Sequence, residues 1–122
     1  MGPVKKLTTE NDVKSIVKKW YDDKQGWHYA AVQSGMGVHG IPDRLGVVPL
    51  IVTPAMVGKQ VGLFIAVESK RPGRRGEADR GMSRHQKLVV DAIRAAGGLA
   101  ICCDGHEDLA GLDRELSSLI GA

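Results

Sequence analysis

The sequence predicts an α/β fold in which a mixed β-sheet is flanked by helices, in the order α-β-β-β-α-β-α. Three segments carry apolar residues at helical spacing, and four shorter apolar runs bounded by turn residues have the composition of strands. The chain shows no internal repeat and no linker. With 122 residues, 43% of them hydrophobic, we expect a single domain over residues 1–122.

The first part of the chain predicts a helix over residues 9–24, followed by strands over 27–33 and 43–52. Thr8 or Thr9 would be the N-cap of the helix, with Asp12 completing a capping box. A glycine-rich loop would join the strands, and a proline inside the second strand favours an edge position or a bulge. The apolar positions of the helix are Val13, Ile16, Val17 and Trp20.

The run 61–70 is the most apolar of the expected strands, so we expect it to be central. It would pair with 43–52 as a hairpin through the turn 53–60. A helix would then begin at Ser83, followed by a fourth strand over 99–103 and a last helix. The apolar stripe of the first of these helices comprises Leu88, Val89, Ala92, Ile93 and Ala96, and that of the last comprises Leu109, Leu112, Leu116 and Leu119.

Several classes of protein are disfavoured by composition. No apolar run approaches the roughly 20 residues that cross a bilayer, and "MGPVKKLTTE" lacks the apolar middle of a signal peptide. We therefore expect a soluble, cytoplasmic protein. Cys102 and Cys103 are adjacent, so we expect both to be reduced, because neighbouring cysteines pair only with strain. Together with His106 they also lack ordinary zinc spacing.

Two opposite charges lie at the end of the most apolar strand. Residues i and i+2 of a strand point to the same side, so Glu68 and Lys70 would project together. The expected hairpin would bring Asp43 near them. Two carboxylates suit Mg²⁺, which prefers oxygen ligands, and a lysine beside the metal can orient water or stabilise charge on phosphorus.

These residues resemble a known family. "GIPD" followed by "AVESK" is similar to the PD-(D/E)XK nuclease superfamily. Within it, the segments "HGIPDRLG", "FIAVESKRPG" and "SRHQKLVVDAIRAAGGLAICCD", in that order, resemble the small VRR-NUC nucleases of phages and bacteria. The resemblance runs from Glu10 to about Asp108 and implies a restriction-endonuclease-like fold with Mg²⁺- or Mn²⁺-dependent hydrolysis of DNA phosphodiesters. The segment "VVPLIVTPAMVGKQVG" departs from it, since compact relatives have a tighter turn there.

The resemblance also implies roles for single residues. Asp43 and Glu68 would be metal ligands, joined by the backbone carbonyl of Ser69, and Lys70 would be the catalytic lysine. Glu10 matches an acidic position that many members place at the site, and would be a further metal ligand. The glutamine that follows the strand in the family corresponds to Gln86.

Each of these residues also has a structural interpretation. Asp43 would belong to a turn, and Glu68 and Lys70 would form an ion pair at a strand end. Glu10 would favour the helix dipole from the first turn. "SRHQ" is a capping box, so Gln86 would be a helix cap. His39 and His85 would touch phosphate, or would be ordinary surface histidines.

A cluster of arginines directly follows the expected active-site strand. The chain carries a net charge of +3, and an anionic partner such as nucleic acid fits this uneven distribution of basic residues. We expect the arginines to contact the DNA backbone without reading bases, unless they form an ordinary solvated loop. They are Arg71, Arg74, Arg75, Arg80 and Arg84.

The sequence therefore predicts a metal-dependent, structure-selective DNA endonuclease that resolves Holliday junctions. The alternatives are a less selective nicking or repair nuclease, and a DNA-binding module on the same fold without catalysis. Resolving a junction requires two cuts on strands related by approximate two-fold symmetry, and this favours a symmetric homodimer with two equivalent sites. The dimer interface would be formed by the last helix or by the first helix with Trp20. The resemblance implies a bacterial or phage-infected host cell.

Overall fold

A computed structural model describes residues 6–31, 42 and 44–121 of the chain. The chain divides into two compact units, Met1–Ile51 and Val52–Ala122, and each is described by itself. The described residues form three α-helices, four strands and three short 3₁₀ turns, so the protein is a mixed α/β protein. Its strands pair as two two-stranded sheets. No helix in these residues is long and apolar enough to cross a membrane. The single-domain organisation stays a prediction.

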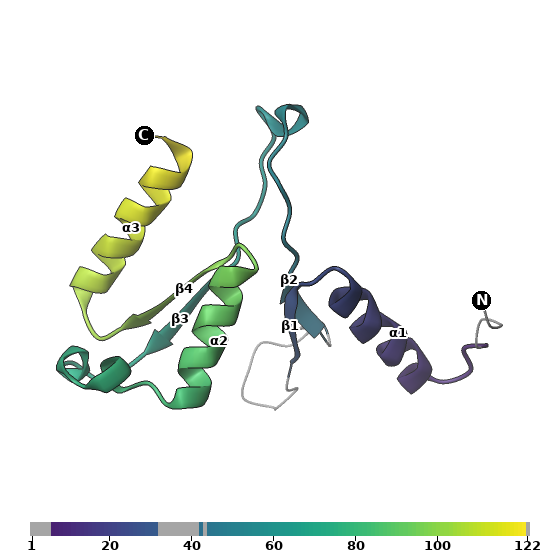
Figure 1. Cartoon of the computed structure of the whole chain (residues 1–122), viewed down its shortest axis with the longest axis horizontal. Helices are drawn as coiled ribbons and strands as arrows, with labels where there is room; N and C mark the ends of the chain where they lie inside the picture. Colours follow the sequence, from purple (N-terminus) through teal and green to yellow (C-terminus); the bar gives the residue numbers. More distant parts are fainter. Residues whose placement is uncertain (1–5, 32–41, 43, 122) are drawn as a thin grey trace. The chain divides into compact units, whose positions relative to one another are not determined.

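The first unit contains α1 (Glu10–Asp23), β1 (Trp27–Ala30) and β2 (Arg44–Val47) (Figure 1). The predicted capping box begins α1: Thr9 Oγ1 accepts a hydrogen bond from the Asp12 N–H, and the Asp12 carboxylate accepts one from the Thr9 N–H, both at 3.1 Å. This pairing satisfies two backbone N–H groups at the helix start and confirms Thr9 as the N-cap.

The strands β1 and β2 are antiparallel, with Trp27 opposite Val47. Gly46 in β2 allows the end of α1 to pack closely on this pair. A Cβ atom at Gly46 would lie 2.6 Å from Cε1 of Tyr21 and 2.7 Å from Cβ of His28, so no larger residue fits. The apolar face predicted for α1 is exposed: Val13, Ile16, Val17 and Trp20 are between 38% and 52% accessible.

The second unit is built on two parallel strands, β3 (Ile65–Ser69) and β4 (Leu99–Cys103). The helix α2 (Arg84–Ala95) connects them and packs against them, and α3 (His106–Ile120) follows β4 (Figure 1). A helix between two parallel strands is the usual crossover connection, because parallel strands cannot be joined by a tight turn. The buried apolar residues described in this unit come from α2, its C-cap and β4: Ile93, Ala96, Leu99, Ala100 and Cys102.

The predicted hairpin of 43–52 with 61–70 would join the two units and stays a prediction. In the structure β2 pairs with β1, and β3 pairs with β4. Within the described part of its unit β3 has β4 as its partner, and Ile65 and Val67 are 40% and 44% exposed, so the expected central position is not observed there. Both strands are also shorter than predicted, and residues 48–64 contain one 3₁₀ turn and no strand. Pro49 has no N–H to donate, which helps to end β2 at Val47.

Burial also corrects one apolar stripe. The spacing predicts Leu88 on the apolar face of α2, yet Leu88 is 56% exposed, while Ile93 on the same helix is 2% exposed. In α3, Leu112 and Leu116 are half-buried and Leu109 and Leu119 are exposed. Spacing alone therefore placed these residues on helices without fixing which of them the fold covers.

Candidate functional site

Glu68 and Lys70 project to the same side of the chain, as the sequence predicted. Burial alternates along β3, with Ala66 and Glu68 half-buried and their neighbours exposed, and Lys70 directly after the strand is half-buried as well. Lys70 Nζ lies 3.6 Å from Glu68 Oε1, and the two side chains are 17% and 34% exposed. The ion pair is thus present, but it lies at a partly covered position and not on a fully solvated strand end.

Gln86 joins these two charged groups. Its Nε2 donates to Glu68 Oε1 at 2.8 Å, and its Oε1 accepts from Lys70 Nζ at 3.0 Å. The same Oε1 accepts from the Ser83 N–H at 2.9 Å, and Ser83 Oγ accepts from the Gln86 N–H at 3.1 Å. Gln86 is therefore both a helix cap and a partner of the charged pair, so the two interpretations of this residue are compatible.

The start of α2 places Gln86 at this position. Ser83 caps the helix, which puts Gln86 in its first turn, and Ile93 two turns later is buried against the sheet. A cavity of about 170 Å³ lies between β3 and α2 beside Glu68 and Gln86. Its walls are formed by Ala66, Val67, Glu68, His85, Gln86, Val89, Val90 and Ile93. The polar residues among these are Glu68, His85 and Gln86.

Of the described side chains at this end of β3, Glu68 offers a carboxylate oxygen that a hard divalent cation could bind. Glu68 uses Oε1 for Gln86 and Lys70, and its Oε2 has no partner within the described ranges. A carboxylate oxygen with the adjacent backbone carbonyl of Ser69 is the kind of oxygen ligand that Mg²⁺ takes, usually with several waters. Further oxygen ligands would have to come from elsewhere in the chain or from a substrate phosphate.

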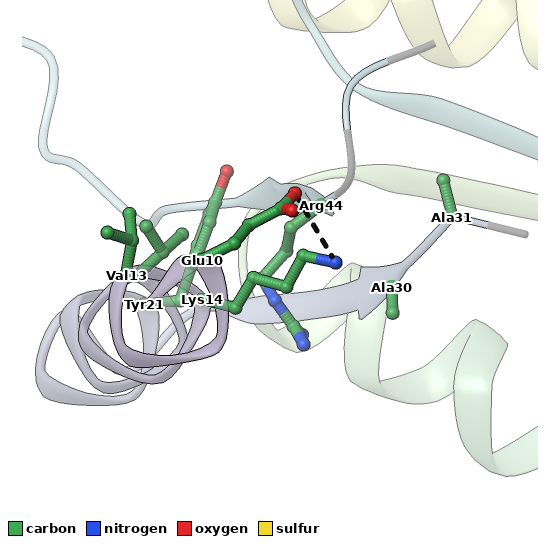
Figure 2. A pocket seen from close by; sticks show the side chains of 8 residues that line it. Glu10, Val13, Lys14, Tyr21, Ala30, Ala31 and Arg44 are labelled. Carbon is green, nitrogen blue, oxygen red and sulfur yellow. Dashed lines mark ion pairs between the residues drawn. The ribbon is translucent and has the colours of Figure 1, made fainter. Parts of the chain in front are cut away.

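Asp43 and His39 lie outside the described residues, and the described Glu10 belongs to the first unit. Glu10 occupies the first turn of α1, where its side chain is 78% exposed and lies 3.7 Å from Lys14 Nζ. Figure 2 shows both residues at an open pocket of about 540 Å³, with Arg44 of β2 on the same pocket. Arg44 directly follows Asp43 in the sequence.

A chain of hydrogen bonds in the first unit was not predicted. His28 Nε2 lies 2.7 Å from Asp22 Oδ1, and Arg44 Nη1 lies 2.8 Å from His28 Nδ1. A guanidinium can only donate, so His28 Nδ1 accepts from Arg44, and His28 Nε2–H donates a hydrogen bond that Asp22 Oδ1 accepts. The hydrogen bond from His28 lowers the pKa of Asp22. These hydrogen bonds connect the end of α1 to the start of β2 through His28. No short sequence motif predicts them.

The arginine cluster is partly neutralised by carboxylates of its own unit. Arg75 forms ion pairs with Asp104, which directly follows β4, and with Glu107 and Asp108 on α3. Arg80 Nη2 lies 2.5 Å from Asp108 Oδ1. Arg74 pairs with Glu77. Arg71 and Arg84 make no ion pair with the described residues, so their charges are the least compensated of the five.

The partners of Arg75 and Arg80 are acidic residues that the sequence analysis did not single out. Asp104 and Asp108 have side chains that are 5% and 8% exposed. The pKa of Asp108 is held far below its usual range, first by the backbone N–H of Asp104 and then by Arg80. The sequence pointed to these partners only through its composition, since the acidic segment "DGHED" could balance the charge of the arginine-rich segment.

The backbone around Arg80 is unusual. Asp79 and Arg80 have φ values of 50° and 56°, in the left-handed region, which costs a non-glycine residue about 1–2 kcal/mol each. The buried Nε of Arg80 finds no hydrogen-bond partner in the described part of the chain. Such a conformation persists only where the surrounding structure holds it.

The cysteines agree with the prediction that they are not paired. Cys102 and Cys103 are both free, and burial raises the pKa of the Cys102 thiol. Within the described residues, no group of three or more His, Cys, Asp or Glu side chains is arranged to hold a metal ion. Asp43, the second expected metal ligand, is outside those residues.

Comparisons of the chain with protein-family models, with curated proteins and with solved structures find no match.

Proposed function

We propose that this protein is a metal-dependent DNA endonuclease with the restriction-endonuclease-like mixed sheet of the VRR-NUC nucleases. The observation that supports the proposal best is the hydrogen-bonded group of Glu68, Lys70 and Gln86 at the end of β3. A shared amide holds a carboxylate and an ammonium on one side of the strand. This arrangement is more typical of a site that cleaves a phosphodiester than of an ordinary ion pair at a solvated strand end.

The cation, Mg²⁺ or Mn²⁺, would be held by Glu68 and the Ser69 carbonyl, and the resemblance to the VRR-NUC nucleases implies Asp43 and Glu10 as further carboxylate ligands. When bound, such an ion acts as a Lewis acid on the phosphate and lowers the pKa of a bound water. The side chains of the protein would position the substrate and stabilise charge. Lys70 would hold its ammonium close to the phosphate and the attacking water, stabilising the negative charge that develops.

Gln86 would fix the orientation of both charged groups. Its amide can donate to the carboxylate and accept from the ammonium at once, so it separates the two charges without neutralising either. It would keep Lys70 Nζ from collapsing onto Glu68, which at 3.6 Å is at the long end of an ion pair. Lys70 would then retain hydrogens for a substrate oxygen.

The preferred substrate in this proposal is branched DNA. A four-way junction needs two cuts related by approximate two-fold symmetry, and a homodimer would supply two equivalent sites. Arg71 and Arg84, which flank the loop after β3 and carry uncompensated charge within the described ranges, would contact phosphates near the cut. The host would be a bacterium or a phage-infected bacterial cell, with the protein in its cytoplasm.

The decisive experiment is a cleavage assay on four-way junction and plasmid DNA with Mg²⁺, with Mn²⁺ and with EDTA. We expect cutting by the wild type with either metal, and none with EDTA. Asp43→Asn and Glu68→Gln should abolish cutting while retaining DNA binding, and calorimetry should show weaker Mn²⁺ binding. Asp113→Asn, which removes an exposed carboxylate on α3, is the matched control and should cut like the wild type.

Three outcomes would change the assignment. Wild-type cleavage by Glu68→Gln would remove Glu68 from the site. Tight DNA binding by the wild type without any cutting, under all metal conditions, would make the chain a DNA-binding module and not a nuclease. Equal cutting of junction and plasmid would point to the less selective nicking or repair nuclease.

A further inference from the structure

The loop between Lys70 and Ser83 is fastened to the end of β4 and the start of α3. The backbone N–H of Arg75 donates to Asp104 Oδ2 at 2.8 Å, and the Lys70 N–H donates to the Cys103 carbonyl at 2.8 Å. The Cys102 thiol lies 3.7 Å from the carbonyl of Arg80. These interactions involve backbone atoms of the loop, so they constrain its path and not only its side chains.

Asp108 is the central acceptor of this arrangement. Its Oδ1 accepts from Arg80 Nη2 at 2.5 Å, and its Oδ2 accepts from Arg75 Nη2 at 2.9 Å and from the Asp104 N–H at 3.0 Å. One nearly buried carboxylate thus binds two arginines from different turns of the loop. We call Asp104, Asp108, Arg75 and Arg80 the loop clamp.

Removing the carboxylate charge at Asp108 would take one acidic partner from both arginines at once. Arg75 would keep Asp104 and Glu107, and Arg80 would keep the longer 3.6 Å contact with Asp104. Both arginines would be held less tightly, because a nearly buried charge that compensates them is lost. The left-handed conformation of Asp79 and Arg80 would then no longer be held in place by Asp108. The loop would relax to other conformations.

The position of the loop in the chain connects the clamp to the proposed active site. The loop starts directly after Lys70 and ends at Ser83, the N-cap that places Gln86. The loop therefore links Lys70, which donates the 3.0 Å hydrogen bond from its Nζ to Gln86 Oε1, to the helix whose first turn carries the acceptor Gln86. A loop held in one conformation keeps these ends in one relative position.

We propose that Asp108 is a positioning residue for the active site: by clamping Arg75 and Arg80 it fixes the loop that holds Lys70 against Gln86, and Gln86 against Glu68. This inference rests on the proposed function where it concerns cleavage. The clamp and its effect on Gln86 are properties of the folded chain and can be measured without DNA or metal.

The test uses nuclear magnetic resonance of the full chain and of the variant Asp108→Asn. We expect the Arg75 backbone N–H to exchange with solvent at least about tenfold faster in the variant, because its acceptor Asp104 is no longer held. We also expect the side-chain amide signals of Gln86 to move toward those of a free glutamine. Asp113→Asn, the same substitution at an exposed residue of α3, should change neither signal.

A second variant separates loss of the clamp from loss of folding. Arg80→Ala removes one arm of the clamp from the loop side and leaves Asp108 and α3 intact. It should therefore move the Gln86 side-chain signals in the same direction even if Asp108→Asn does not fold. In cleavage assays, both variants should lower kcat by about tenfold or more with little change in KM, as expected when catalytic groups are misplaced but DNA binding remains.

The outcomes distinguish the two proposals. Faster exchange at Arg75 with an unchanged Gln86 side chain would show that the clamp exists but does not position the site, and this would overturn the inference. Unchanged signals at both residues would overturn it as well. If the wild-type protein cuts no DNA, the proposed function fails, while the Arg75 and Gln86 signals still decide whether Asp108 positions Gln86.

Discussion

Gln86 Nε2 donates a hydrogen bond of 2.8 Å to Glu68 Oε1, which joins the first turn of α2 to the last part of β3. Because Gln86 also accepts from the Ser83 N–H, a single side chain both begins a helix and contacts the proposed catalytic carboxylate. The two roles can be separated by substitution, since Ser83 takes part in the cap and not in the interaction with Glu68.

The first prediction separates these roles. Ser83→Ala should lower the free energy of unfolding by about 0.5–2 kcal/mol through loss of the hydroxyl cap. It keeps the backbone N–H that donates to Gln86 Oε1, so it should change the cleavage rate of the folded protein far less than a substitution of Gln86 does. Gln86→Glu keeps an acceptor for the Ser83 N–H but replaces the donor to Glu68 by a negative charge, so it should slow cleavage. Urea denaturation and single-turnover cleavage measure the two effects. Equal rates for Gln86→Glu and wild type would leave Gln86 as a cap alone.

The second prediction concerns Lys70. Lys70→Ala should reduce the cleavage rate by about a hundredfold or more, as for loss of a group that stabilises transition-state charge, and Mn²⁺ affinity should change little. Lys70→Arg should not restore the rate, since a planar guanidinium is not equivalent to a compact ammonium beside Gln86. Single-turnover rates and calorimetry provide the readouts. Normal cleavage by Lys70→Ala would make the lysine an ion-pair partner only.

The third prediction concerns DNA binding by the loop. Replacing Arg71 and Arg84 together by alanine should reduce the slope of log affinity against log salt by about two, one for each phosphate that is no longer neutralised. Arg75→Ala with Arg80→Ala should change this slope less, because their charges already face Asp104 and Asp108. Binding titrations at several salt concentrations measure both. An identical slope in the Arg71 and Arg84 double variant would mean that these residues do not meet DNA.

The fourth prediction concerns pH. The folded state holds the pKa of Asp108 below its usual range, so the unfolded chain binds a proton at Asp108 near pH 4 while the folded chain does not. The stability from this residue is therefore present above about pH 4 and is lost as pH falls further toward the folded pKa. Asp108→Asn should lose less stability than the wild type between about pH 4 and pH 2. Denaturation at a series of pH values, with Asp113→Asn as control, tests this; parallel curves would contradict it.

The fifth prediction concerns assembly and substrate. We expect light scattering to give the mass of a homodimer, and competition assays to show faster cutting of a four-way junction than of linear duplex of equal length. Trp20→Ser, on the exposed face of α1, and Leu119→Ser, on α3, should identify the interface, since whichever disrupts the dimer lies in it. A monomer that cuts both substrates at the same rate would refute this prediction and leave the nuclease proposal standing.

The sequence by itself determined local structure and the presence of the charged pair. Thr9 with Asp12, and Ser83 with Gln86, form capping boxes as predicted, because capping depends on residues three apart in the chain. Glu68 and Lys70 project to one side because side-chain direction alternates along a strand. These features need no information about distant segments.

Only the tertiary structure decided which distant segments meet. The hairpin of 43–52 with 61–70 would join the two units and stays a prediction, whereas the structure shows β3 paired in parallel with β4. The same pairing brings "DGHED" to the arginine-rich loop, so Arg75 and Arg80 meet Asp108 from 33 and 28 residues away. Ion pairs between residues far apart in the sequence follow no period or spacing, so the sequence does not identify the partners. The tertiary structure shows that the loop, which was expected to contact DNA, is also held by α3.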